Sequence, residues 1–240
     1  MFSVNLIDQS LDIADIEFAS RRLDKIKVLN PKTVSVIHEN ESFTENSERV
    51  KVEDFIKNIF DYEYGAHITV SYPSLISAID SRGDIIAAMG YRDGVKKDFF
   101  LEQYIDKNTE DAIEAVSGKK VERSNIVEIG NLSSEGRGGA VFLFAATAEY
   151  LINRGTTHLV FTATEHLKKY FTLIGLEVIK LGEATVEKLK DKSSAKSWGS
   201  YYDTKPKVVS IDLTENLDAI RTAYGSRLLL RNMEPTLTVL

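Results

Sequence analysis

The stretch NIVEIGNLSSEGRGGAVFLFAATAEYLINRGTTHLVFTATEHLKKYFTLIGL, residues 125–176, decides the fold of this chain. It predicts a strand, a glycine-rich turn, a buried helix, a second strand and a short helix that ends at a glycine. A glycine loop that leads into a helix presents free backbone N–H groups and the positive end of the helix dipole. The stretch therefore predicts a phosphate or pyrophosphate site, and with it a phosphorylated cofactor.

The predicted turn, EGRGGA, contains Gly136, Gly138 and Gly139. Glycine adopts positive φ angles without steric cost and lets the backbone approach a ligand closely. The segment that follows, Val141–Leu151, is apolar on nearly every helical face, which predicts a helix buried on more than one side. The same pattern also fits a strand–helix connection whose glycines serve only tight packing, so the loop alone leaves both interpretations open.

Composition excludes several classes of protein. The 240 residues, 43% of them hydrophobic and 28% charged, suffice for one sizeable core. The absence of cysteine excludes a disulfide scaffold and a cysteine nucleophile. The four histidines show no metal-ligand spacing, so we expect no metal site. The net charge of −6 argues against a nucleic-acid binder, which would carry a basic stripe.

The sequence shows no targeting or membrane-spanning segment. Its N-terminal residues, MFSVNLIDQSLDIADIEF, lack the basic and apolar regions of a signal peptide. The longest mostly apolar run, Ala140–Ile152, contains a glutamate and is too short to cross a bilayer. We therefore expect a soluble, cytoplasmic protein.

Hydrophobic periodicity outlines the rest of the chain. It predicts strands or extended segments at residues 32–38, 75–80, 85–92, 99–105, 177–181 and 207–213, and helices at 50–64, 109–116, 184–192 and 217–224. The segments 75–80 and 85–92 form a hairpin, because a short turn rich in Gly and Asp separates them. Antiparallel pairs early and strand–helix–strand units late indicate one α+β domain around a mixed α/β sheet.

This order of elements resembles the GNAT acyltransferase superfamily. In that family the turn has the form Q/R-x-x-G-x-G/A and binds the pyrophosphate of acyl-CoA. Gly138 and Ala140 match the pattern, whereas Glu135 stands where the family has glutamine or arginine. Arg137 is the candidate for the missing charge. The resemblance implies a three-layer α/β/α fold and an acyl-CoA or acyl carrier protein (acyl-ACP) donor. The candidate residues for the donor site are Asn131, Leu132, Arg137, Gly138, Gly139 and Ala140. Asn131 could orient the acyl carbonyl or cap the turn.

The resemblance also implies a general acid for the leaving thiolate. Many members of the superfamily carry a tyrosine four residues before the glycine of a Y-x-x-x-G-F pattern. In this chain that position is Phe171, before Gly175, and Tyr170 beside it is the candidate for the acid.

Several longer and rarer strings lie between about residues 64 and 212: YGA (64–66), AMGYR (88–92), FLEQY (100–104), VEIGNL (127–132), FTAT (161–164) and WGSYY (198–202). Together they resemble the thermostable hemolysin family. This resemblance implies a GNAT-like layout similar to that of acyl-homoserine lactone synthases. It also implies a single domain over residues 1–240, with an insertion at about 93–124 and a C-terminal extension at about 214–240.

Glu128 is the main candidate for a catalytic residue. A carboxylate within an apolar strand is costly to bury unless it is paired, and burial raises its pKa toward the range of a general base. An acyl transfer to an amine needs such a base. The alternative is a structural ion pair with Arg92 or Arg123, because such pairs also perturb pKa values. Alternation places Glu128 and Leu132 on the same face of their strand.

Four more side chains are candidates for substrate binding. Arg92 could hold a substrate carboxylate, although a surface cation at the end of a strand is the more common role, and Glu102 lies in a segment that could line the insertion. Trp198 and Tyr201 could wall an acyl pocket, although anchoring a loop to the core is the more common role of such aromatic residues.

These observations predict an acyltransferase that moves an acyl group from acyl-CoA or acyl-ACP to a small amine acceptor. One alternative is a hemolysin that acts on membranes directly, as the family name implies. Another is a GNAT-fold protein that binds an acylated partner without catalysis, for which the departures at Glu135 and Phe171 leave room.

Overall fold

The computed structural model describes residues 31–38, 47–80, 82–95, 98–136, 139–222 and 236–239. Their strands form one eight-stranded sheet with the order β6-β7-β5-β4-β3-β2-β1-β8. The strands are β1 (Pro31–His38), β2 (Ser74–Asp80), β3 (Ile85–Asp93), β4 (Ile126–Ser134), β5 (His158–Ala163), β6 (Ile179–Glu183), β7 (Lys207–Asp212) and β8 (Thr236–Val239).

The sheet is mixed. The strands β1 to β4 pair antiparallel in sequence order, β4 and β5 pair parallel, and β7 pairs antiparallel with both β5 and β6. At the far edge β8 pairs parallel with β1. The predicted hairpin of β2 and β3 is confirmed, whereas β8 was not expected from the sequence.

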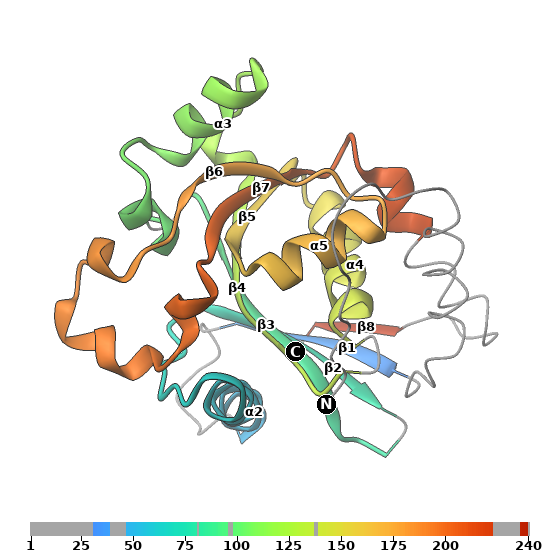
Figure 1. Cartoon of the computed structure of the whole chain (residues 1–240). Helices are drawn as coiled ribbons and strands as arrows, with labels where there is room; N and C mark the ends of the chain where they lie inside the picture. The colour runs from blue at the N-terminus through green and yellow to red at the C-terminus, as the bar shows by residue number, and fades with distance from the viewer. Residues whose placement is uncertain are drawn as a thin grey trace.

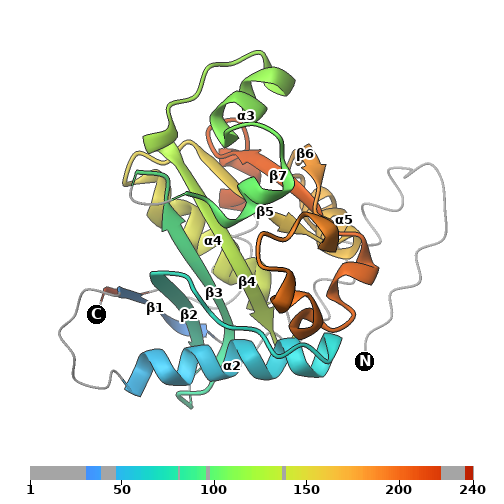
Figure 2. The ribbon, with the colours of Figure 1, turned by 90° about the vertical axis from the view of Figure 1, so that its left-hand side faces the viewer.

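Helices cover both faces of the sheet (Figure 1). The helix α2 (Ser47–Tyr64) packs across β2, β3 and β4 on one face, and Figure 2 shows its course across these strands. The helices α4 (Gly139–Ile152) and α5 (Glu165–Leu173) pack on the other face. The helix α3 (Thr109–Ser117) contacts β6 near the top of Figure 1. The expected three-layer α/β/α architecture is confirmed.

The helix α4 forms the centre of the main core. Ten of its 14 residues are buried, as its apolar sequence predicted. Phe144 stacks on Phe171 of α5 at 4.5 Å between ring centroids and meets Phe161 of β5 at 6.4 Å. Tight aromatic packing therefore fixes α4 and α5 against β5, the strand that follows the glycine-rich turn and α4.

Two predicted elements differ from the structure. Residues 99–105 were expected to be extended but form the 3₁₀ helix η1 (Phe100–Tyr104), because the carboxylates of Glu102 and Glu128 accept backbone N–H groups at its start. The helix expected at 184–192 shrinks to η3 (Val186–Lys188). Ala184 bonds to Pro206 in the manner of a strand, and its side chain is buried together with that of Leu189, so tertiary contacts override helix propensity here.

The remaining short helices lie between β3 and β4 and before β7. Residues 93–124, which the sequence predicts to be an insertion, contain η1, α3 and the start of η2 (Arg123–Asn125). The segment 193–202, expected to be a loop, forms most of η4 (Lys192–Trp198) and the start of η5 (Tyr201–Thr204). Of the helix expected at 217–224, residues 217–222 are helical and the last two lie outside the described residues.

Candidate active site

A cavity opens where β4 and β5 separate. The two strands pair at three positions only, from Ile126–His158 to Glu128–Val160. Beyond that point residues 129–132 of β4 and 161–162 of β5 line the cavity from opposite sides. Its volume of about 240 Å³ is below the roughly 300–1,000 Å³ of pockets that enclose a whole drug-sized ligand. The cavity therefore suits the reacting end of a ligand.

A β-bulge shapes the β4 side of this cavity. Gly90 of β3 pairs with Gly130, and Ala88 pairs with Ser133. Between these pairs β3 has one residue and β4 has two, residues 131–132. A bulge of this kind disrupts pairing and redirects side chains, and bulges are common next to active sites.

The bulge corrects one expectation from the sequence. Asn131 adopts a positive φ of 53°, which is uncommon for a residue other than glycine. The extra residue reverses the alternation of side chains, so Leu132 packs against the core cluster of Val127 and Ile129. The expectation that Leu132 shares a face with Glu128 is therefore wrong. Both Asn131 and Leu132 line the cavity.

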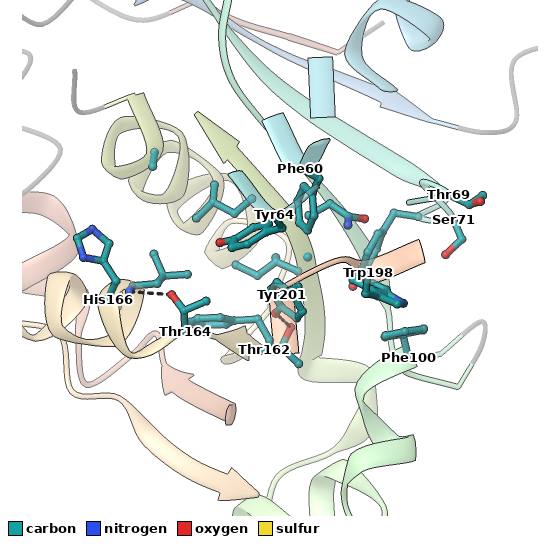
Figure 3. A pocket seen from close by; sticks show the side chains of 18 of the residues that line it. Phe60, Tyr64, Thr69, Ser71, Phe100, Thr162, Thr164, His166, Trp198 and Tyr201 are labelled. Atoms are coloured by element: carbon teal, nitrogen blue, oxygen red, sulfur yellow. Dashed lines mark hydrogen bonds between the residues drawn. The ribbon is translucent and has the colours of Figure 1, made fainter. Parts of the chain in front are cut away.

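Aromatic side chains from three separate segments form one wall of the cavity (Figure 3). Phe60 and Tyr64 come from α2, Phe100 comes from η1, and Trp198 and Tyr201 come from the WGSYY segment. Trp198 lies 5.4 Å from Tyr201 and 6.2 Å from Phe100 between ring centroids. The predicted pocket residues Trp198 and Tyr201 thus both line the cavity and also hold this segment to its neighbours.

The WGSYY segment is docked on the C-terminal end of α2. Ser200 donates from its backbone N–H and its hydroxyl to the carbonyl of Tyr64. Gly199 lies so close that a Cβ there would be 2.1 Å from the Tyr64 carbonyl oxygen. The YGA and WGSYY segments are far apart in the sequence but therefore pack directly against each other.

Tyr72, which sequence reasoning did not single out, lies across the paired glycines of β3 and β4. A Cβ at Gly90 would be 2.4 Å from Tyr72 Cβ, and a Cβ at Gly130 would be 2.1 Å from its hydroxyl oxygen. Only glycine leaves this space at both positions. The glycines in AMGYR and VEIGNL were the available signal, because a glycine within a strand often marks a close approach of another group.

Glu128 is buried, with 1% of its surface exposed, and every contact to its carboxylate comes from a donor. Oε1 accepts from Leu101 N at 3.0 Å and from the Tyr72 hydroxyl at 3.3 Å, and Oε2 accepts from Phe100 N at 2.8 Å. Arg92 Nε lies 3.7 Å from Oε2. The structural pair with Arg92 that the sequence offered as an alternative is therefore present.

Burial is the largest influence on the acidity of Glu128. It raises the pKa of the carboxyl to about 7, although the charge of Arg92, the N–H groups of Phe100 and Leu101 and the Tyr72 hydroxyl all favour the ionised form. A pKa near 7 is the value at which a carboxylate works well as a general base at neutral pH. Structural pairing and a basic role are thus compatible at this position.

The guanidinium of Arg92 donates its hydrogen bonds to backbone carbonyl groups. Its guanidinium donates to the carbonyls of Asp98 at 3.1 Å and Ser71 at 3.2 Å. It lies over the Tyr72 ring at 5.0 Å, and its buried Nε has no hydrogen bond within the described residues. Because Arg92 is not among the residues that line the cavity, the structure places it where it supports Tyr72 and Glu128.

Arg123, the other cation that the sequence offered to Glu128, pairs with Glu102 instead. Its guanidinium donates two hydrogen bonds to the Glu102 carboxylate, of 2.6 and 3.0 Å, and one to the Glu110 carboxylate, of 2.9 Å. Glu102 accepts from the N–H and hydroxyl of Thr109, the first residue of α3. Glu102 does not line the cavity, and its contacts hold η1 to α3.

The glycine-rich turn lies at the other end of the cavity. Gly136 has a φ of 88°, and a Cβ at Gly139 would be 3.1 Å from both the Ile86 carbonyl oxygen and Ser134 Oγ. Ala140, in the first turn of α4, lines the cavity, whereas Glu135 is exposed. Arg137 and Gly138, two of the expected donor-binding residues, lie outside the described residues.

The start of α5 forms the opposite wall. The Thr164 hydroxyl accepts from Leu167 N and so caps this helix, and Thr164 and His166 both line the cavity. Figure 3 shows them at the end away from Trp198. Phe171 lines the cavity, but Tyr170, the candidate for the general acid, is not among the lining residues. Within the described ranges no cluster of three or more His, Asp or Glu side chains could hold a metal ion.

A family model for thermostable hemolysins matches residues 43–217. The chain belongs to the thermostable hemolysin family. This membership confirms the resemblance carried by the YGA, AMGYR, VEIGNL and WGSYY strings. A search among curated proteins finds none that matches the chain.

Solved structures show the same fold at low sequence identity. BjaI, a CoA-dependent acyl-homoserine lactone synthase solved with MTA, is 14% identical with a TM-score of 0.56, covering 87% of this chain and 93% of that chain. TofI in an apo form is 13% identical with a TM-score of 0.55, covering 85% and 98%. The AHL synthase LasI is 13% identical with a TM-score of 0.51, covering 80% and 94%. The GNAT-like fold expected from the sequence is confirmed.

Proposed function

We propose that this protein is an acyltransferase that moves an acyl group from a thioester donor, acyl-CoA or acyl-ACP, to a small amine acceptor. The observation that carries the proposal is the cavity between the diverging strands β4 and β5, with the bulge on one side and the Tyr72–Glu128 pair beside it. The fold shared with BjaI, which has also been solved with SAM and isopentyl-CoA, supports it.

The donor is expected to enter beside the glycine-rich turn. Ala140 lies at that end of the cavity, where the N-terminus of α4 favours negatively charged groups. Residues 129–132 have no β5 partner, so those of their backbone N–H groups that point away from β3 are the expected donors to the thioester carbonyl oxygen. The aromatic wall of Phe60, Trp198 and Tyr201 is then available to the acyl chain.

The reaction forms a C–N bond and breaks a C–S bond. The nitrogen of a neutral amine attacks the thioester carbon, a tetrahedral intermediate forms, and its collapse releases the thiol. One N–H proton must leave during this sequence. Glu128 is the expected base, because its carboxyl has a pKa of about 7 and lies next to a residue that lines the cavity.

Thiol release tests the proposal directly. Purified protein would be mixed with acyl-CoA thioesters of several chain lengths, with acyl-ACP, and with a panel of small amines. Because the chain contains no cysteine, any thiol that a thiol reagent detects comes from the donor. Mass spectrometry would identify the amide. If no donor binds in calorimetry and none releases thiol, the proposal fails.

A variant that fills the cavity distinguishes acyl-CoA binding at this site from non-specific binding elsewhere on the protein. Ala140→Trp places a large ring at the donor end of the cavity, and we expect it to weaken acyl-CoA binding at least tenfold. The matched control is Val116→Trp on α3, at a side chain that is 51% exposed and away from the cavity. Equal affinity in both variants would place the donor elsewhere.

Membership of the thermostable hemolysin family gives direct membrane lysis as a second candidate function. Among the described helices, none is both long and apolar enough to cross a membrane. Dye-loaded vesicles distinguish the two functions. Release of dye by the protein alone supports direct lysis, whereas release only after incubation with an acyl donor and an amine indicates that a lipid-like product is lytic.

A further inference from the structure

Glu128 does not line the cavity, although it is the carboxylate best suited to act as a base. Its two oxygens face the N–H groups of Phe100 and Leu101, Arg92 Nε and the Tyr72 hydroxyl. Glu128 is 1% exposed and is not among the lining residues, so a substrate amine in the cavity does not contact the carboxylate directly. Of the groups that face the carboxylate, only the hydroxyl can both accept and donate a proton.

Tyr72 occupies the position between the cavity and the carboxylate. Its side chain lines the cavity, and its hydroxyl donates to Glu128 Oε1 over 3.3 Å. The hydroxyl oxygen also lies against Gly130, which lines the cavity too: a Cβ there would be 2.1 Å from that oxygen. A phenolic oxygen accepts as well as donates a hydrogen bond, so the hydroxyl can take up a proton while it donates to Glu128.

We propose, resting on the acyltransferase function above, that Tyr72 is a catalytic residue that relays the proton of the acceptor amine to Glu128. The glycines at positions 90 and 130 are then required for catalysis, because they create the space in which the ring of Tyr72 lies.

The relay balances without a further reactant. As the amine nitrogen attacks the thioester carbon, its proton moves to the Tyr72 oxygen and the Tyr72 proton moves to Glu128 Oε1. The C–N bond forms, and collapse of the tetrahedral intermediate breaks the C–S bond. Glu128 then returns its proton through the same hydroxyl to the leaving thiolate. The products are an amide and a thiol, and both residues regain their starting state.

The surroundings of the pair favour this concerted transfer. Burial is the main cause that raises the pKa of Tyr72 well above its usual value, and the charge of Glu128 adds to it, so a free tyrosinate is disfavoured. Arg92 is the charged side chain that faces both groups, and Tyr201 is a neutral neighbour of Tyr72. Tyr72 thus passes a proton on without holding a charge.

Single-turnover rates of four proteins test the relay: Tyr72→Phe, Glu128→Gln, the double variant and the wild type. Tyr72→Phe keeps the ring and removes only the hydroxyl, so we expect at least about a hundredfold loss of rate with unchanged donor affinity. The acid limb of the wild-type pH–rate profile, expected near pH 7, should disappear in this variant. The double variant should be no slower than the slower single variant, since both changes break one path.

Tyr104→Phe is the matched control, because it removes the hydroxyl of another buried tyrosine, which is bonded to Tyr202 and does not line the cavity. We expect it to keep the wild-type rate and pH profile. If Tyr72→Phe keeps the acid limb, or if the two single losses multiply in the double variant, the relay is overturned while acyl transfer stands. If none of the amines in the panel leads to thiol release by the wild type, both the acyl-transfer proposal and the relay fail.

A second measurement on the wild type guards against a variant that fails to fold. Single-turnover rates in mixtures of H₂O and D₂O should depend on the deuterium fraction along a curve, because two protons move together. A straight line, which indicates one moving proton, would overturn the relay.

Discussion

Two carboxylates that the sequence presents alike, Glu128 on β4 and Glu102 in η1, lie in opposite electrostatic environments. Burial acts on both and by itself favours the neutral form of each carboxyl. At Glu102 the hydrogen bonds from Arg123 and Thr109 outweigh it, so the pKa falls below its usual value. At Glu128 burial prevails and the pKa rises to about 7.

The difference lies in how the cation is placed. Arg123 meets Glu102 with two short bonds, whereas Arg92 approaches Glu128 only to 3.7 Å and donates to backbone carbonyls instead. A bidentate arginine stabilises the charged form strongly. A pair of carboxyls with diverging pKa values separates a structural role from a chemical one. Glu102 is therefore expected to hold η1 to α3, and Glu128 to accept a proton.

The largest expected effect is on the rate of acyl transfer. Glu128→Gln keeps the size of the side chain and removes its basicity, so we expect kcat to fall by about 10²- to 10⁴-fold. Glu102→Gln should leave kcat close to that of the wild type, since Glu102 does not line the cavity. Thiol release measured side by side checks both. Equal losses in the two variants would remove the distinction between the carboxylates.

The next effect is on the free energy of unfolding, and here we expect the substitution at Glu102 to matter more than the one at Glu128. Glu102→Gln loses charge-assisted hydrogen bonds from Arg123 and Thr109. We expect the free energy of unfolding to fall by about 1.5–3 kcal/mol, measured by urea denaturation. A double-mutant cycle with Arg123→Gln should show that the two losses do not add. Additive losses would mean that the ion pair is not a stabilising unit.

A third effect concerns the glycine that makes space for Tyr72. Gly130→Ala puts a Cβ in contact with the Tyr72 ring, and we expect a loss of about 1–3 kcal/mol in the free energy of unfolding, together with slower acyl transfer. Tyr72→Ala/Gly130→Ala is the control, because the clash needs both side chains. If Gly130→Ala destabilises the protein equally with and without the Tyr72 ring, the close contact is not its cause.

The last effect is on the pH dependence of stability. The pKa of Glu128 rises on folding from an ordinary value of 4.5 to about 7, so the folded state binds the proton more tightly. Stability from this group is fully present below pH 4.5 and is lost as the pH rises to about 7. Glu102 acts in the opposite sense, because its pKa is lowered on folding. The stability that it contributes is present at pH values above the pKa of the unfolded chain and is lost as the pH falls.

Comparison of unfolding free energies between pH 4.5 and 8 checks these signs. The wild type should lose stability relative to Glu128→Gln as the pH rises through this window. Relative to Glu102→Gln, the wild type should lose stability only as the pH falls toward 4.5. Parallel curves for the wild type and Glu128→Gln would show that the Glu128 pKa is not raised on folding.

The sequence by itself determined most of the elements of the central sheet and its main helices, because these follow from local patterns. Apolar residues on every face made α4 a buried helix, and the Gly- and Asp-rich turn made β2 and β3 a hairpin. The motif strings were enough to identify the family. Glu128 also stood out, since a carboxylate in an apolar strand needs a partner.

Only the tertiary structure decided what those strings do together. The β4 bulge, the docking of Gly199 on the end of α2 and the position of Tyr72 over two glycines all join residues far apart in the chain. The choice of Arg92 rather than Arg123 for Glu128 is of the same kind. Local periodicity holds no information on such contacts, because they depend on how whole elements pack.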